Sequence, residues 1–250
     1  MKKIIFLWAV VLAAQFSFAQ GGLRVNMWYG TVPSDQVEEH LAFEKYFKEI
    51  WENQKKAGNI SGWEMWEIIN PYSDALETTY LYVSFTTAEN RKNNASYETV
   101  PKGLDESSWK LIQEKQIGHY SKVFNLVADY KGGFGGDVDS PPHPYGVINY
   151  MDVDWYKSYE YEEMELKTFM PINKSNGMLG WGLVKVLNHF GSQRPVNYMT
   201  VDFYESLDQI YELRANTAKI PAAALAANKK IDKIRTLRSS DIIKLIDYAR

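Results

Sequence analysis

The sequence contains no cysteine, and this absence excludes several classes of protein at once. Without thiols there can be no disulfide, no thiol nucleophile, no iron–sulfur cluster and no cysteine-type zinc site. The 250 residues, 45% of them hydrophobic and 24% charged, must therefore be held together by a packed core. That length and composition are ordinary for a globular protein and provide enough material for such a core.

A basic excess is also missing. The formal net charge is −3, and it becomes −5 without residues 1–19, which carry two lysines and no acid. Proteins that bind nucleic acid or anionic membrane surfaces depend on clustered Lys and Arg side chains. The charge balance therefore predicts that nucleic acid is not a partner.

A single apolar run stands out, and it is too short to span a membrane comfortably. Residues 1–20 read MKKIIFLWAVVLAAQFSFAQ, with a basic start, an apolar stretch over Ile4–Ala14 and a small-x-small triplet at Ser17–Ala19. This order is typical of a secretory signal peptide, the alternative being a retained N-terminal anchor. We expect cleavage after residue 19, near Gln20, a periplasmic or secreted mature protein, and no membrane span.

Motifs that would identify a reaction are missing as well. The chain has no Gly-rich phosphate loop, no G-x-S-x-G elbow and no H-E-x-x-H pair. Its four histidines have no partner at ligand spacing on a helix, so we expect no zinc site. Residues 131–145, within KGGFGGDVDSPPHPYG, form a Gly/Pro linker by composition, and too few oxygens surround Asp137 and Asp139 for a calcium loop.

The chain does contain one strand-like sequence pattern that occurs twice. Residues 62–70 read GWEMWEIIN, and residues 180–188 read GWGLVKVLN. Between 62–85 and 180–203, six of 24 aligned positions are identical, where chance predicts roughly one or two. The identical pairs are Gly62/Gly180, Trp63/Trp181, Asn70/Asn188, Tyr80/Tyr198, Val83/Val201 and Phe85/Phe203. We interpret the chain as an internal repeat, with one unit at 20–130 and the other at 146–250.

Both units predict the same order of elements. In the first, the patterns predict a strand at 24–30, a helix at 35–57, strands at 62–70 and 80–85, a helix near 105–115 and a last segment at 120–130. In the second they predict a strand at 146–154, a helix at 158–170 ended by Pro171, strands at 180–188 and 197–203, a helix from about 206 and a last segment at 240–248. Each last segment suits a strand or a helix. With strands there, the order is β-α-β-β-α-β, the ferredoxin-like unit, and the fold class is α+β.

Two such units in one chain resemble the dimeric α/β-barrel superfamily, here as a fused pseudo-dimer. The resemblance rests on the element order and on the G-W-x-[ML]-x-x-[IV]-[IL]-N hairpin. It covers residues 23–250 and extends to secreted members and to antibiotic-biosynthesis-monooxygenase-like domains. Haem-binding relatives use an axial histidine, a role that His119 or His189 could fill. Monooxygenase relatives act without a cofactor through Asn, Trp or Arg groups, which Asn26, Asn149 and Trp28 could provide.

Alternation along the second hairpin strand separates two faces. We expect the apolar face, with Leu81, Val83 and Phe85 and their counterparts Met199, Val201 and Phe203, to pack under the helices. The opposite face should then line the space between the two sheets; its candidate ligand-binding residues are Tyr80, Tyr82, Tyr198 and Asp202. On the first hairpin strand, Trp63 and Glu67 share one face, as do Trp181 and Lys185, and Glu67 and Lys185 could approach each other or a ligand.

Three functions remain open at this point. The leading expectation is an exported protein that binds a small hydrophobic or aromatic molecule between the two sheets. The alternative is a cofactor-independent, monooxygenase-like enzyme that uses the same cavity. The third is a structural protein whose open sheet edges or exposed aromatic residues recruit a partner. The resemblance cannot choose among them, because one fold hosts many functions, and the oligomeric state stays open as well.

Overall fold

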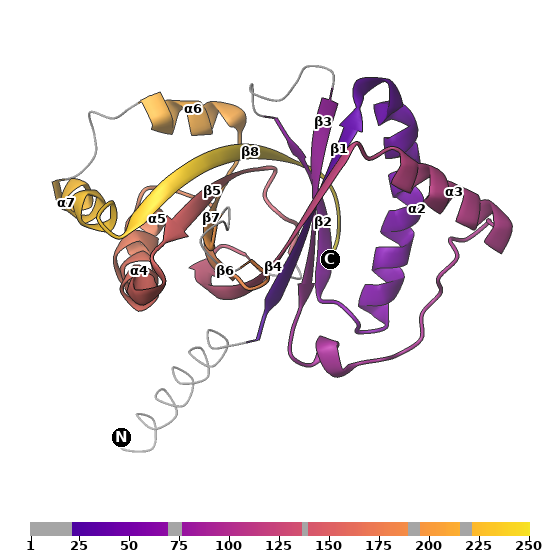
Figure 1. Cartoon of the computed structure of the whole chain (residues 1–250), viewed down its shortest axis with the longest axis horizontal. Helices are drawn as coiled ribbons and strands as arrows, with labels where there is room; N and C mark the ends of the chain where they lie inside the picture. Colours follow the sequence, from indigo (N-terminus) through magenta and orange to yellow (C-terminus); the bar gives the residue numbers. More distant parts are fainter. Residues whose placement is uncertain (1–21, 70–76, 137–139, 190–195, 216–221) are drawn as a thin grey trace, which may run out of the picture.

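A computed structural model describes residues 22–69, 77–136, 140–189, 196–215 and 222–250. The predicted signal peptide, the expected turn at 70–74 and the residues Asp137 and Asp139 lie outside these ranges. Eight strands form a closed barrel that has helices on two opposite sides (Figure 1). Within the described ranges, no helix has the length and apolar character needed to cross a bilayer.

Both halves have the expected β-α-β-β-α-β order, and the last segment of each is a strand. The first half consists of β1 (Arg24–Pro33), α2 (Val37–Lys56), β2 (Gly62–Ile68), β3 (Glu77–Thr86), α3 (Glu106–Gly118) and β4 (Lys122–Phe134). The second consists of β5 (Tyr145–Val153), α4 (Ser158–Met164), α5 (Met170–Ser175), β6 (Gly180–Val186), β7 (Tyr198–Tyr204), α6 (Leu207–Ala215), α7 (Ala222–Ile231) and β8 (Arg235–Ala249). Short 3₁₀ turns occur at Ser34–Gln36, Asn90–Lys92 and Trp155–Lys157.

The two halves close the barrel through their last strands, because each last strand pairs with its own half on one edge and with the other half on the second edge. The strand order is β1-β3-β2-β8-β5-β7-β6-β4, with every neighbouring pair antiparallel. Strand β8 pairs with β2 of the first half, where Ala249 lies opposite Trp63, and β4 pairs with β6, where Phe134 lies opposite Trp181. This is a pseudo-dimeric α/β barrel in one chain. Because each of these strands has two neighbours, the expected open sheet edges do not exist.

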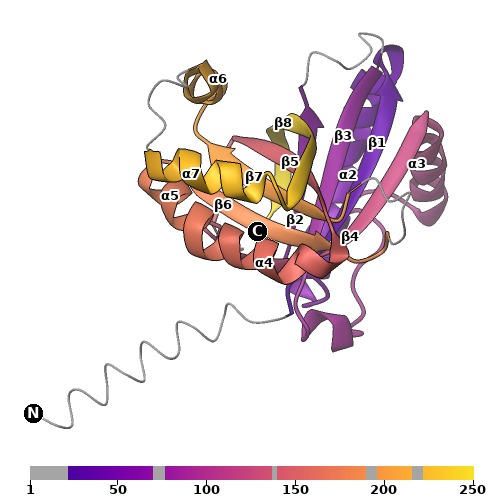
Figure 2. The same ribbon diagram turned by 60° about the vertical axis from the view of Figure 1, so that its left-hand side comes forward.

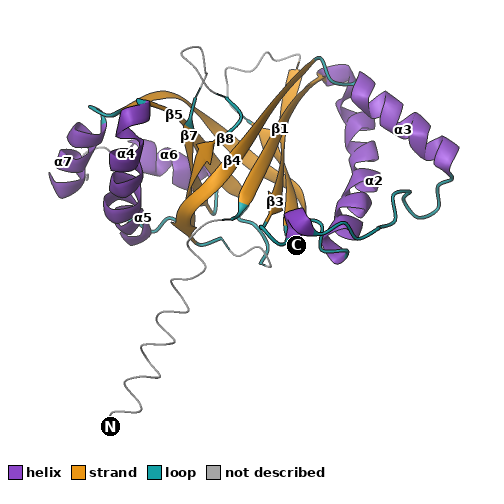
Figure 3. Ribbon diagram, turned by 60° about the horizontal axis from the view of Figure 1, so that its bottom comes forward, coloured by secondary structure: helices purple, strands orange, loops and turns teal. Residues whose placement is uncertain are grey.

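Helices cover the outside of each half, as Figures 2 and 3 show. Helix α2 lies against β1, β2 and β8, with α3 beside it. On the other side of the barrel, α5 lies against β4 and β6, and α6 lies against β7. The aromatic residues Trp155, Tyr156 and Tyr159, near the start of α4, are exposed, so the expectation of exposed aromatic side chains holds for this corner.

The expected orientation of the two strand faces was wrong. Leu81 and Val83 of β3 point into the barrel lumen, where they pack with Met199 of β7 and with Met27 and Leu126. The tyrosine face lies under the helices instead: Tyr80 and Tyr82 pack with Trp63 and Trp51 beneath α2, and Tyr198 packs with Tyr161 beneath α4. A narrow eight-stranded lumen takes branched apolar side chains, whereas a buried tyrosine needs a hydroxyl partner, which the helices supply.

Three local features also differ from expectation. Pro171 does not end the helix: the chain continues from α4 through a π-helical segment at Glu165–Phe169 into α5, which contains the proline. Strand β4 continues to Phe134, so the segment between the halves is shorter than 131–145. The spacing of Asp35 and Glu38 predicts a capping box, but α2 begins after a 3₁₀ turn without a side-chain cap.

Candidate functional site

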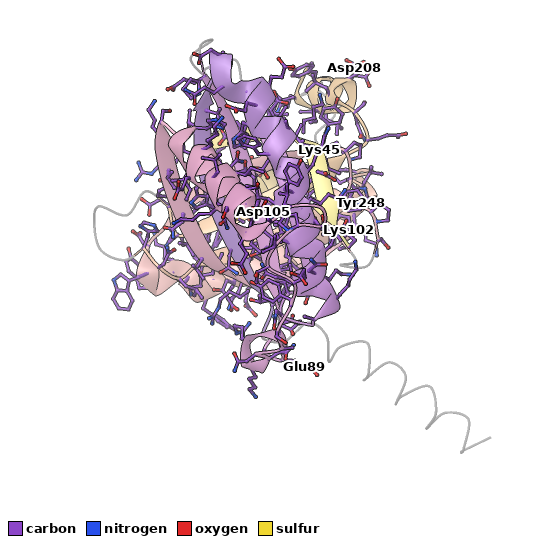
Figure 4. The ribbon with its side chains drawn as sticks, turned by 90° about the vertical axis from the view of Figure 1, so that its right-hand side faces the viewer. Lys45, Glu89, Lys102, Asp105, Asp208 and Tyr248 are labelled. Carbon is purple, nitrogen blue, oxygen red and sulfur yellow. The ribbon has the colours of Figure 1, made fainter. Side chains whose placement is uncertain are left out.

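A cavity of about 500 Å³ lies between the outer face of the first half's sheet and helices α2 and α3; we call it the outer cavity. Its floor comes from β1, β2, β3 and β4, and its roof from the two helices. Figure 4 looks onto this side of the molecule, with Asp105 at the start of α3 in front of α2. Asp105 accepts a hydrogen bond from the Ser108 N–H and so fixes the start of α3 over the cavity.

Aromatic rings form much of the cavity wall. Trp28 of β1 packs against Tyr82 of β3 with 5.2 Å between ring centroids, and edge-on against Tyr120 with 4.5 Å between centroids. Trp63 of β2 lies behind Tyr82 with its ring stacked at 6.4 Å. Strand alternation places these side chains on the outer face. Such a wall offers flat apolar surface to a planar molecule.

A polar cluster is set into this aromatic wall. The buried residues of α2 are His40 and Glu44, one helical turn apart on the face that meets the sheet. Tyr82 Oη lies 2.7 Å from His40 Nε2 and donates to Glu44 Oε1 at 2.9 Å. Gln116 of α3 also donates to Glu44 Oε1, and Tyr120 donates to Tyr82 Oη at 3.1 Å. Side chains from β3 and α3 therefore converge on one carboxyl group of α2.

Burial changes the protonation of both titratable groups on α2. The pKa of Glu44 is raised to about 7, because desolvation outweighs the hydrogen bonds from Tyr82 and Gln116 that favour the carboxylate. The pKa of His40 is lowered to about 4, first by burial and then by the neighbouring His119. His40 is therefore neutral near pH 7, while Glu44 is available in both its protonated and its ionised form.

The hydrogen-bond pattern leaves one oxygen of Glu44 for a bound molecule. Within the described part of the chain, its recorded hydrogen bonds all reach Oε1. Two further groups of the wall, Trp63 Nε1 and Gln116 Oε1, are buried without a hydrogen-bond partner there. Unpaired buried polar groups are uncommon and costly, and they cluster where a site is built to meet a ligand. The cavity thus combines a base and unpaired polar atoms, with a neutral imidazole bonded to Tyr82 behind the wall.

The corresponding face of the second half is filled by its own side chains. Tyr198 donates to Glu162 Oε1 at 2.5 Å, and Lys185 donates to the same oxygen at 3.2 Å while lying 5.3 Å from the Tyr198 ring centroid. Asn149 donates to Asp202 at 2.8 Å and accepts from Ser240. Its counterpart in the first half, Asn26, makes a longer contact of 3.4 Å to Ser84. Asn26 and Ser84 line the outer cavity. The outer cavity, by contrast, lies on the first half.

The structure separates the candidate residues that the sequence suggested. Trp63 and Tyr82 line the outer cavity, and Tyr80 lies nearby, stacked on His40. Tyr198, Asp202, Trp181 and Lys185 belong to the second half. Glu67 and Lys185 do not meet, because β2 and β6 are on opposite sides of the barrel and both side chains point outward.

Sequence reasoning missed the polar centre of the site. His40 and Glu44 were absent from the predicted residues, as were Gln116 and Tyr120. A signal was present in the helix: positions 40, 44, 47 and 51 share one face, and two of them are polar. A histidine and a glutamate on the buried side of an amphipathic helix are a candidate functional pair.

The available histidines do not fit an axial haem ligand. His119 Nε2 lies 3.2 Å from Glu39 Oε2, and the His119 ring is stacked on Phe43. His189 Nε2 lies 3.2 Å from the Asn125 carbonyl oxygen. Neither side chain is among the residues that line the outer cavity. In the described ranges, no group of three His, Asp or Glu side chains has the geometry of a metal site.

Comparison with known proteins gives matches at the level of structure. No family model matches the sequence, and no curated protein matches it. A candidate monooxygenase from Fusobacterium nucleatum subsp. nucleatum has a TM-score of 0.62 and 10% identity over 92% of this chain and 95% of its own. An anthrone oxidase-like protein has a TM-score of 0.54 and 13% identity over 92% and 94%. A candidate chlorite dismutase has a TM-score of 0.50 and 9% identity over 91% and 96%. Such likeness establishes the fold.

Proposed function

We propose that this protein is a cofactor-independent, monooxygenase-like enzyme that oxidises a planar aromatic substrate in the outer cavity, with Glu44 as the base. The observation that carries the proposal is a buried carboxyl group with a pKa of about 7, held by Tyr82 and Gln116 in an aromatic wall. A base works best when its pKa lies near the working pH. The monooxygenase and oxidase-like names of structures with this fold support the same reading.

The chemistry balances without an added reductant. Glu44 takes a proton from a ring CH₂ group that is acidified by a neighbouring carbonyl or phenol, which leaves a carbanion. The carbanion gives electrons to O₂ and a C–O bond forms. The peroxide anion takes the proton back from Glu44, and the resulting hydroperoxide loses water to leave a ketone. The CH₂ group is oxidised by four electrons and O₂ is reduced by four, with one oxygen atom in the product and one in water.

The cluster around Glu44 has defined tasks in this reaction. Tyr82 and Gln116 hold the carboxyl group in place, so its free oxygen faces the cavity in a fixed direction. Neutral His40 supports the Tyr82 hydroxyl from behind. Trp28 and Tyr120 supply ring surface for the substrate. Asn26 and Ser84 add polar contacts on the cavity floor.

Oxygen uptake tests the proposal. The mature protein is incubated with tricyclic anthrones and phenols, and ¹⁸O₂ labelling is followed by mass spectrometry. We expect one labelled oxygen in the ketone product and a rate loss on the order of 100-fold or more in Glu44→Gln. Glu165→Gln is the matched control, because Glu165 is a buried carboxyl of the second half with a pKa also raised to about 7 by burial. Equal rates in the wild type and Glu44→Gln would contradict the proposal.

Export is part of the proposed function. The support is the order of residues 1–20, with a basic start, an apolar stretch and a cleavage triplet. An enzyme outside the cytoplasm has no access to reduced nicotinamide cofactors, and a reaction that needs only O₂ and substrate suits that location.

A further inference from the structure

A second cavity lies inside the barrel, on the other side of the sheet from the outer cavity. It has a volume of about 170 Å³ and is lined mainly by apolar side chains of both halves, among them Trp66, Val83, Ile148, Val201 and Phe203. The outer cavity opens on one face of β1 and β3, and this lumen cavity lies on the opposite face. The two cavities are therefore separated by the thickness of a single sheet.

Gly182 accounts for part of this hollow. Its neighbours Trp181 and Leu183 point outward into the packing beneath the second half's helices, so position 182 faces the lumen. A Cβ atom built there meets a single neighbour, Tyr130 Cε2, at the ordinary contact distance of 3.5 Å. A methyl group would therefore fit at position 182 in ordinary contact, and glycine leaves that space empty.

One charged pair lies in the lumen wall. Arg250 donates to Glu64 Oε1, Trp66 Nε1 donates to Glu64 Oε2 at 2.9 Å, and the guanidinium group sits 5.3 Å from the Phe85 ring centroid. Both side chains are almost fully buried. The two charges neutralise each other, and a further ion in the lumen would have to give up its hydration without a free counter-charge.

The cavity also reaches the outside at one end of the barrel. Leu23 precedes β1, Phe85 lies near the end of β3, and Gly136 follows β4; all three belong to the lining. Because neighbouring strands are antiparallel, these positions fall at the same end of the barrel, beside Arg250.

We propose that the lumen is a second binding site, which takes a neutral, apolar molecule about the size of a single aromatic ring. An apolar cavity of roughly 150 Å³ stays dry and binds benzene in a well-studied engineered case. The lumen has that size and that chemistry, and Trp66 and Phe203 offer ring faces for stacking, with 6.1 Å between their own centroids. The compensated Glu64–Arg250 pair selects against charged ligands.

Fluorine NMR tests this site with fluorobenzene as the probe and 4-fluorobenzoate as its charged counterpart. We expect saturable binding of fluorobenzene and at least tenfold weaker binding of 4-fluorobenzoate. Gly182→Leu fills the lumen and should weaken fluorobenzene binding at least tenfold. Ser84→Leu, one position from Val83 on β3 but on the opposite face, fills the outer cavity and should change the affinity less than twofold.

The outcomes separate the two cavities. Loss of binding in Ser84→Leu with full binding in Gly182→Leu would place the probe in the outer cavity and overturn the proposal, as would the absence of saturable binding. If Gly182→Leu does not fold, Gly182→Ala adds one methyl group and should still weaken the affinity severalfold. Oxygen uptake by Gly182→Leu should match the wild type, so failure of the lumen site leaves the proposed enzyme activity untouched.

Discussion

The hydroxyl groups of Tyr29 and Tyr150 lie 3.0 Å apart and form a hydrogen bond across the inside of the barrel. Tyr29 belongs to β1 and Tyr150 to β5, which are on opposite sides of the eight-stranded ring. Burial raises the pKa of both tyrosines well above the ordinary value, so the pair stays protonated. One bond therefore ties the first half to the second through the centre of the molecule.

A double-mutant cycle on this pair should give a favourable coupling energy of about 0.5–1.5 kcal/mol. Tyr29→Phe and Tyr150→Phe each leave a buried hydroxyl with one partner fewer, while the double variant removes both groups. The measurement is urea unfolding of the four proteins. If the two single effects simply add, the hydroxyls do not support each other.

Tyr82→Phe should raise the pKa of Glu44, because the Tyr82 hydroxyl stabilises the carboxylate form. Loss of one hydrogen bond corresponds to a shift on the order of one pH unit. The carboxyl ¹³C titration of Glu44 reports this shift directly, and the acidic limb of any pH–rate profile should move the same way. Tyr80→Phe is the control, since Tyr80 is stacked on His40 but does not donate to Glu44. An unchanged titration in Tyr82→Phe would argue against the cluster.

Glu165 should make the stability of the protein depend on pH. Burial raises its folded-state pKa from 4.5 to about 7 despite the nearby Arg235. A raised folded-state pKa stabilises the fold below about pH 4.5, and this contribution is lost as the pH rises towards 7. The variant Glu165→Gln lacks this contribution. Between pH 4.5 and 7.5 the free energy of unfolding of the wild type should therefore fall, relative to that of the variant, by on the order of 1–3 kcal/mol. A constant difference across that range would contradict the raised pKa.

Lumen packing should dominate the stability of β4. Leu126 is fully buried in the lumen, whereas Val123 on the same strand is 55% exposed. Leu126→Ala should cost about 2–5 kcal/mol, because it leaves a cavity in a close-packed interior. Val123→Ala should stay within about 0.5 kcal/mol. Thermal or urea unfolding measures both losses in the free energy of unfolding. Similar losses for the two variants would mean that lumen packing does not dominate stability.

Intact-mass spectrometry tests the proposed export. Protein from cells with a working secretion system should begin at or near Gln20. A retained Met1 in such cells would overturn the signal-peptide assignment, and cells with blocked export provide the precursor as a reference.

The element order could be predicted because it depends on local patterns. Turn residues, alternation and the repeated hairpin motif place the first three strands of each half within a few residues of their bounds, whereas the last segment of each half stayed open between strand and helix. Which face of a strand points inward is not local: in Leu81–Phe85 both faces carry large side chains that can be buried, and barrel closure decides between them. The polar cluster was missed for the same reason. His40 and Glu44 form a site only through their hydrogen bonds to Tyr82 of β3 and Gln116 of α3, which are distant in sequence.

The pairing of each last strand with the other half has a kinetic consequence. Pairing Trp63 with Ala249 and Phe134 with Trp181 joins segments that are distant in sequence. Long loops must close before such contacts form, and the entropy lost in closing them comes before any stabilisation of the fold. Folding should accordingly be slow for a chain of this size. If the first half folds first, the outer edges of β2 and β4 stay unpaired until the second half folds against them. During that interval the molecule is most exposed to aggregation, and a nascent chain that crosses a membrane before folding would complete its barrel on the far side.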